Sequence, residues 1–201
     1  MDYIIRSGTL ADHDLIYALK AESVRPYVEK IWGWDEDYQK KDFDGDFSHM
    51  EQFNVIEVDG SFAGFVQYYF EYPYFVVAEI HLLPEFRGKG IGSEILRYLQ
   101  EACIAYDRKI RIGCFKENQR AKALYQKLGF MQTGETDTRY ILEYGRNTSV
   151  TNMTADTVSR SDSARSILPS DDARVPEEDY IMRKHHSFRI AVFICFGQKS
   201  L

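Results

Sequence analysis

The sequence predicts a mixed α/β fold in which helices and strands form layers, and three observations support this prediction. The dipeptide Asp59-Gly60 stands between two β-rich runs, which is a hairpin signature. A glycine-rich turn at 87–92 separates a long strand from an amphipathic helix. Strands and helices then alternate up to residue 144, as expected for a sheet covered by helices.

The expected strands lie between turn signals, where β-branched and aromatic residues are frequent. In chain order they are 3–6, 54–58, 62–70, 75–83, 111–115 and 139–144. The expected helices lie where apolar residues recur at helical spacing or strand alternation is absent. In chain order they are 14–20, 27–40, 93–106 and 118–128. We expect Thr9 or Asp12 to cap the first helix, a kink near Gly33 in the second, and Gly129 to end the last.

Composition argues against several classes of protein. The net charge is −6 and no basic face is visible, so nucleic acid is not an expected partner. The three cysteines are odd in number and lack CxxC spacing, which argues against a disulfide framework and a zinc site. No signal peptide is visible, and the apolar run 190–196 is far shorter than the roughly 20 residues of a membrane helix. We therefore expect a cytoplasmic protein with reduced thiols, no metal and no membrane contact.

The composition changes after residue 146. Ten Ser or Thr residues fall within 147–175, which has no glycine and little apolar periodicity. We therefore expect one domain over 1–146, then a disordered linker and a C-terminal extension of unknown role over 147–201. The run 190–196 resembles a single strand, which cannot bury its faces alone.

The segment 80–92, IHLLPEFRGKGIG, carries the strongest chemical signal. Because Gly88, Gly90 and Gly92 have no Cβ, a ligand can approach the backbone of the turn closely. Amides at the start of a helix favour phosphate, and Arg87 and Lys89 add positive charge. The turn is therefore predicted to bind a pyrophosphate.

Three phosphate-binding loops compete for this turn. The Walker loop, GxxxxGK followed by Ser or Thr, has no match. The dinucleotide fingerprint GxGxxG fits Gly88 and Gly90, but its third place is Ser93 and the expected later acid does not follow a second parallel strand. The acyl-CoA loop, Gln or Arg followed by xxGxG, matches Arg87, Gly90 and Gly92.

Together with the downstream segment 115–130, FKENQRAKALYQKLGF, this turn resembles motifs A and B of the GNAT acetyltransferase superfamily. Two motifs in the family's order are far more specific than either one alone. The resemblance covers 3–144, and YVEKIWGWDE at 27–36 is similar to a bacterial subgroup of mostly unassigned substrate.

The resemblance implies the GNAT fold, a mixed and mostly antiparallel sheet with helices on both faces and a splayed central strand pair. It also implies acetyl transfer from acetyl-CoA to a primary amine by direct attack in a ternary complex. The cofactor-binding residues that it implies are Leu82, Leu83, Arg87, Gly88, Lys89, Gly90, Ile91, Gly92, Ser93, Asn118 and Tyr125. Asn118 would bind the pantetheine arm, cap its helix, or do both.

Two side chains are candidates for proton transfer. The resemblance makes Tyr125 the acid that protonates the departing thiolate, although it could instead be a core tyrosine of its helix. Glu79 is the candidate base, because a carboxylate in an apolar strand is costly without a task or a partner. Strand alternation places His81 on the same face as Glu79, so His81 could take this role.

Aromatic side chains near acids suit a cationic amine. The candidate acceptor-binding residues are Tyr27, Trp32, Trp34, Tyr68 and His81, with core packing as the alternative for the aromatic ones. The sequence leaves open the identity of the acceptor (protein N-termini, lysines, polyamines, amino acids or aminoglycosides) and a family-type homodimer. The alternative function is a sensor or interaction module that binds acyl-CoA without catalysis.

Overall fold

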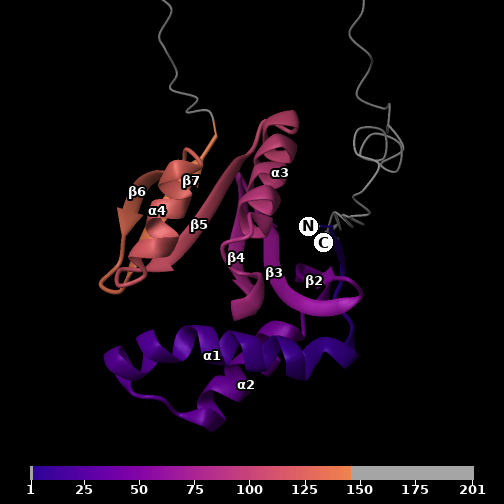
Figure 1. The fold of residues 1–201 in the computed structure, drawn as a ribbon. Coiled ribbons are helices and arrows are strands. Elements are labelled where there is room, and N and C mark those ends of the chain that lie inside the picture. Colours follow the sequence, from indigo (N-terminus) through magenta and orange to yellow (C-terminus); the bar gives the residue numbers. More distant parts are fainter. Residues whose placement is uncertain (1, 146–201) are drawn as a thin grey trace, which may run out of the picture. The chain divides into compact units, whose positions relative to one another are not determined.

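The computed structural model describes residues 2–145 (Figure 1). The predictions for 147–201, a linker, an extension and a strand at 190–196, therefore lie outside the described residues. Within 2–145 no helix is both long enough and apolar enough to cross a membrane.

The strands within 2–145 form one seven-stranded sheet in the order β1-β2-β3-β4-β5-β7-β6. In chain order they are β1 (Tyr3–Ser7), β2 (Phe53–Val58), β3 (Ser61–Glu71), β4 (Tyr74–Leu82), β5 (Lys109–Phe115), β6 (Met131–Glu135) and β7 (Arg139–Tyr144). All neighbouring strands pair antiparallel except β4 and β5, which are parallel. The mixed and mostly antiparallel sheet is therefore confirmed.

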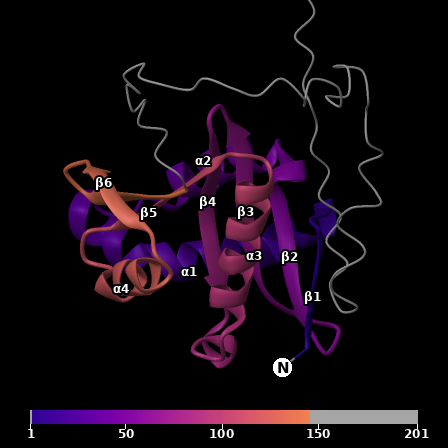
Figure 2. The ribbon, with the colours of Figure 1, turned by 90° about the horizontal axis from the view of Figure 1, so that it is seen from above.

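Helices cover both faces of this sheet (Figures 1 and 2). They are α1 (His13–Trp32), α2 (Glu36–Phe47), α3 (Ile91–Ala105) and α4 (Gln119–Lys127), with short 3-10 turns at Leu10–Asp12, Met50–Gln52 and Pro84–Phe86. Successive strand residues point to opposite faces. On β2, Val55 accordingly packs in one core cluster with residues of α1 and α2, and Ile56 packs in another with residues of α3 and α4.

The predicted hairpin is confirmed, because Asp59 and Gly60 both adopt the positive φ of a tight β-turn, 51° and 74°. The predicted single helix over 27–40 is wrong. α1 continues through Pro26 to Trp32, where Gly33 (φ 81°) ends it, and Asp35 caps a separate helix α2 by accepting the Tyr38 amide. A left-handed glycine followed by an N-cap separates two helices rather than bending one.

The sequence analysis missed strand β6. This strand lies at the edge of the sheet and pairs with β7 alone. Its residues are mostly exposed, so the apolar alternation that identifies a half-buried strand is absent.

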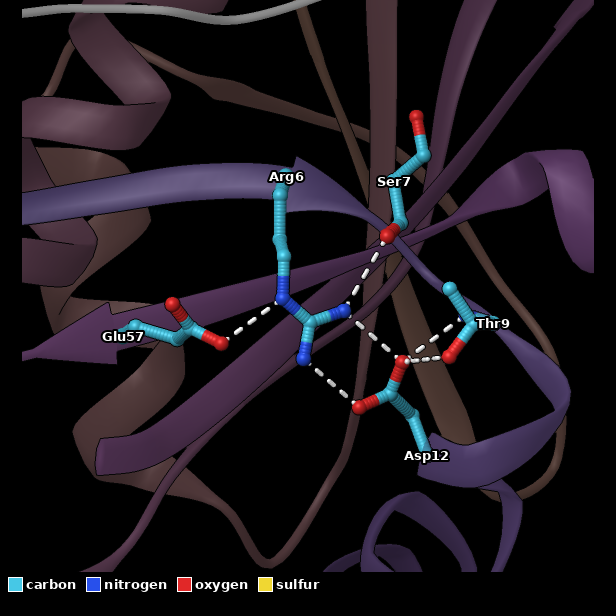
Figure 3. Close-up of polar contacts among 5 residues, drawn as sticks. All are labelled: Arg6, Ser7, Thr9, Asp12 and Glu57. Atoms are coloured by element: carbon cyan, nitrogen blue, oxygen red, sulfur yellow. Dashed lines mark hydrogen bonds and ion pairs between the residues drawn. The ribbon is translucent and has the colours of Figure 1, made fainter. Parts of the chain in front are cut away.

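An ion-pair network fixes β1, β2 and the start of α1 to one another (Figure 3). The Arg6 guanidinium donates to both carboxylate oxygens of Asp12, at 2.8 and 2.7 Å, and to Glu57 Oε1 at 2.7 Å. Asp12 also accepts from the Thr9 amide and hydroxyl. These hydrogen bonds, with those from Arg6 the strongest, lower the pKa of Asp12 to about 2 despite its burial.

We expect Asp12→Asn to lower the free energy of unfolding at pH 7 by about 2 kcal/mol, because the charge that Arg6 pairs with is lost. Since the folded pKa of Asp12 is lowered, its stabilisation is present above the unfolded value of about 4 and is lost as pH falls through about 2. Urea unfolding at pH 7, 4 and 2 should show wild type and variant converging at low pH. A stability difference that does not change with pH would contradict the ion-pair origin.

Candidate functional site

The parallel strands β4 and β5 pair over only part of their length. Residues 74–77 of β4 pair with 109–112 of β5. β4 then continues to Leu82 and β5 to Phe115 without pairing to each other. The splayed central strand pair is therefore present, and backbone groups on both sides of the opening lack a partner strand.

A β-bulge lies where the two strands part. On β3, Gln67 and Tyr68 are neighbours, but their partners on β4 are Glu79 and Val77. Ala78 is therefore left without a partner on β3. Because a bulge bends and twists its strand, this one explains why β4 turns away from β5 after Val77.

The opening leads into a cleft of about 570 Å³, a size typical of small-molecule sites. Its lining includes these residues proposed from sequence: Tyr27, Glu79, His81, Leu82, Arg87, Gly88, Gly90, Ile91, Gly92, Ser93, Asn118 and Tyr125. The proposed residues outside its lining are Trp32, Trp34, Tyr68, Leu83 and Lys89.

The glycine-rich turn presents free amides to the cleft. Gly88 and Gly90 have φ of 77° and 94°, a region that side chains with a Cβ rarely adopt, and α3 begins directly after them. Within 2–145 the amides of residues 88–93 donate to no backbone carbonyl. Together with the positive end of the α3 dipole, they form a cradle that could hold a phosphate group.

Two arginines flank this cradle. Arg87 Nε donates to the Leu82 carbonyl at 2.7 Å, which fixes the guanidinium at the end of β4. Arg120, at the start of α4, lines the cleft, and its guanidinium lies 4.0 Å from where a Cβ on Gly88 would stand. The sequence analysis missed Arg120, although it stands two positions after the proposed Asn118. Lys89 instead lies over the Phe86 ring, 5.6 Å from its centroid.

The free edge of β4 can be assigned from hydrogen-bond alternation. The Leu83 amide donates to the Ala63 carbonyl of β3, so the backbone polar groups of Leu83 point away from the opening. Those of Ile80 and Leu82 therefore point into it. There the Leu82 carbonyl accepts Arg87 Nε, and the remaining groups can bind an extended amide-bearing ligand. The Leu83 amide is already used by β3, whereas the Leu82 amide faces the opening, and the cofactor contacts of both residues stay predictions.

Tyr125 reaches the cleft from α4 and is 6% exposed. Its ring packs 6.0 Å from that of Phe130. Burial, with a smaller contribution from Cys114, raises the pKa of the phenol well above its ordinary value. The hydroxyl therefore holds its proton at neutral pH, as a general acid must.

Asn118 caps α4, because its Oδ1 accepts the Ala121 amide at 3.0 Å. The side chain also lines the cleft. Since the cap uses only the oxygen, the side-chain amide nitrogen remains a donor for a ligand.

Glu79 and His81 lie together on the α1 side of the sheet. Glu79 Oε2 lies 3.0 Å from His81 Nε2, and Glu79 Oε1 lies 3.0 Å from Lys20 Nζ on α1. Burial raises the pKa of Glu79, but the hydrogen bond from His81 and the charge of Lys20 together lower it below its ordinary value. The carboxylate is therefore ionised at neutral pH and holds the His81 ring in place.

The aromatic candidates divide into two groups. Tyr27 stacks on Phe115 at 5.0 Å, and the exposed Trp32 meets Phe115 edge-on at 6.5 Å, so both lie at the end of β5. Trp34 donates to Glu36 at 2.7 Å, away from the cleft lining. Tyr68 stacks on the ring of Phe75 and packs against the core cluster beneath α3.

The sequence analysis also missed Ser23 and Arg139. Ser23 Oγ is buried in the cleft lining and has no hydrogen-bond partner within 2–145. Arg139, the first residue of β7, lines the cleft from the opposite side. Both lie outside the sequence motifs that point to a ligand. Only the packing of α1 and β7 around the opening brings them to the cleft. No cluster of His, Cys, Asp or Glu within 2–145 could hold a metal ion.

Comparison with known proteins extends this description. Residues 16–130 match the sequence model of the Acetyltransferase (GNAT) family. A Bacillus subtilis strain 168 protein, proposed to be a ribosomal protein bS18-alanine N-acetyltransferase, is 28% identical over 144 residues, which cover 71% of this chain and 89% of that protein. An uncharacterized N-acetyltransferase of Archaeoglobus fulgidus is 33% identical over 118 residues, covering 51% and 80%.

The fold is also similar to that of solved structures. PaiA N-acetyltransferase from Thermoplasma acidophilum, crystallised in complex with coenzyme A, aligns with a TM-score of 0.59 and 18% identity. The alignment covers 73% of this chain and all of that one. At this identity the similarity supports the fold alone.

We expect Gly90→Ala to weaken coenzyme A binding about tenfold, because a Cβ disfavours the positive φ that aims the turn amides. Isothermal titration calorimetry measures the affinity. Gly60→Ala is a matched control, since it has a similar φ of 74°, open space for a Cβ and no place in the cleft. Both variants should lose about 1 kcal/mol of stability. Equal affinity for coenzyme A in the two variants would argue against the cradle.

Proposed function

The chain belongs to the GNAT family of acetyltransferases, and from this premise we propose that it transfers the acetyl group of acetyl-CoA to a primary amine by direct attack in a ternary complex. The family makes it an acyl-CoA-dependent N-acyltransferase. The observation that carries the proposal is the cleft in the sheet opening, where a phosphate cradle, a buried phenol and a carboxylate–imidazole pair meet.

Acetyl-CoA supplies an activated thioester when bound. The amides of 88–93, with Arg87 and Arg120, are placed to bind its phosphates at the start of α3. The backbone groups of Ile80 and the Leu82 amide would bind the pantetheine arm, since the Leu82 carbonyl already accepts from Arg87, and the Asn118 side-chain amide adds a donor. The Leu82 amide is a candidate to stabilise negative charge that develops on the carbonyl oxygen.

The two proton transfers belong to opposite sides of the opening. Tyr125, from α4, gives its phenolic proton to the departing sulfur. Glu79 is the general base, and it acts through its hydrogen-bonded partner His81. An amine with an ordinary pKa near ~10.4 enters protonated, so a base beside the thioester is needed before attack.

A primary amine is the acceptor that fits this arrangement and the relatives. The Bacillus subtilis relative is named for an alanine amine of a ribosomal protein. For the present chain, Tyr27 and Trp32 at the end of β5 form the aromatic wall that a cationic amine would pass.

A screen for thiol release over an amine library tests the function. Turnover with acetyl-CoA and at least one primary amine is expected. Calorimetric binding of acetyl-CoA without thiol release across the library would instead favour the non-catalytic acyl-CoA sensor. Sedimentation of the full chain tests the homodimer, which stays a prediction.

We expect Tyr125→Phe to lower kcat about 100-fold with little change in the KM for acetyl-CoA, because the sulfur loses its proton donor while the packing stays. Steady-state kinetics at saturating acetyl-CoA measures this effect. Tyr140→Phe, in β7 and outside the cleft lining, is the control and should keep full turnover. Full turnover in Tyr125→Phe would exclude the acid role.

We expect Glu79→Gln to lower kcat/KM about 100-fold over pH 6–9, because the lowered pKa of Glu79 keeps it ionised throughout this range. His81→Gln should remove the acid limb of the pH–rate profile if the proton passes to the imidazole. The two profiles together locate the accepting atom. An unchanged rate and acid limb in Glu79→Gln would remove Glu79 from the mechanism.

A further inference from the structure

A second cavity of about 350 Å³ adjoins the cleft. It shares Ala78, Glu79, Ile112, Gly113 and Arg139 with the cleft, so the two spaces meet at the parting of β4 and β5. Its other lining residues are Asp46, Gln67, Tyr69, Val76, Val77, Arg111 and Ile141. None of these is in the phosphate cradle, whereas the proposed base Glu79 lines both spaces. A volume of this order suits a small molecule.

One side of this second cavity carries an excess negative charge. Lys20 lies between the two carboxylates, with Nζ 3.2 Å from Asp46 and 3.0 Å from Glu79. One ammonium cannot neutralise two carboxylates, so this trio has a net charge of −1. An incoming ammonium group would be attracted to this side, next to the proposed base.

The opposite side carries an unmatched positive charge. Arg111 is neutralised by Glu143, at 3.0 and 3.1 Å, and its guanidinium stacks on the Tyr74 ring at 3.5 Å. Arg139 has no carboxylate partner within residues 2–145. Its guanidinium instead lies over the ring of Phe115, 4.3 Å from the centroid.

The stacking leaves the hydrogen-bonding edge of Arg139 free. Phe115 is itself stacked on Tyr27, so the guanidinium rests on a packed aromatic pair. The N–H groups of a guanidinium point outward in its own plane, and a contact with a ring face does not use them, so they can still bind both oxygens of a carboxylate.

We propose that the acceptor is a small amine that also carries a carboxylate, with its amine at Glu79 and its carboxylate on Arg139. This inference rests on the proposed acetyl transfer and specifies its substrate class. Asp46 and Glu79, the two carboxylates of the trio, line the same cavity as Arg139, so the charges around this cavity complement those of a zwitterion. A polyamine would instead place a second ammonium group near Arg139, which disfavours that class.

Thiol release with matched acceptors tests this proposal. The acceptors are ω-amino carboxylates of increasing chain length and common amino acids, each compared with its own carboxamide. For the best acceptor we expect kcat/KM to be about tenfold higher with the carboxylate than with the carboxamide. Arg139→Gln should bring the ratio of kcat/KM between carboxylate and carboxamide to about one, through the KM of the carboxylate, and Arg139→Lys should partly restore this ratio.

Arg108→Gln is the matched control, because the Arg108 guanidinium also lies over aromatic rings, those of Phe70 and Tyr72, but lines neither cavity. It should keep the carboxylate preference. Equal rates with carboxylates and carboxamides in the wild type, or an undiminished preference in Arg139→Gln, would overturn the proposal.

Calorimetry on the protein saturated with coenzyme A separates this proposal from the proposed function. Binding of the amino carboxylates that is tighter than that of their carboxamides and depends on Arg139, without any thiol release, would refute catalysis alone. Turnover of amines without a carboxylate preference would refute the acceptor class alone. Absence of both binding preference and turnover would refute both.

Discussion

The parting of β4 and β5 is the constraint on which the rest of the site depends. A sheet normally satisfies the backbone groups of an internal strand on both edges, because an unpaired buried amide or carbonyl is costly. The pairing of β4 with β5 stops after Val77 and Ile112, and the bulge at Ala78 lies directly after this point. The free edge in the middle of the sheet is thus available to a ligand with amide groups of its own.

The opening also brings the two faces of the sheet into one reaction space. The α3 face supplies free amides and the arginines beside the glycine-rich turn, which suit an anionic cofactor. The opposite face supplies Glu79, His81 and Lys20, which suit an ammonium group and its deprotonation. Opposite charges therefore reach the reaction centre from opposite layers, and each layer is held by its own core cluster.

Sequence reasoning predicted elements whose geometry is set by a few adjacent residues. The Asp59-Gly60 turn, the glycine-rich turn before α3 and the Asn118 cap are local, because each depends on the φ of its own residues or on a hydrogen bond within one helical turn. Sequence reasoning failed where a segment lacks apolar periodicity, or where several residues of the same type are equally good candidates. Edge strand β6 lacks a buried face, and the rings of Trp34 and Tyr68 are indistinguishable in sequence from those that reach the cleft end of β5.

The sequence by itself determined most of the strands, the glycine-rich turn before α3 and the family resemblance, since each of these depends on one contiguous segment. The tertiary structure alone decided which charges meet. Lys20 reaches Glu79 from α1, and Arg139 reaches the opening from β7, because strand register and helix packing bring distant segments together. Charge balance around a cavity depends on such distances in space, and these are not encoded in the spacing of residues along the chain.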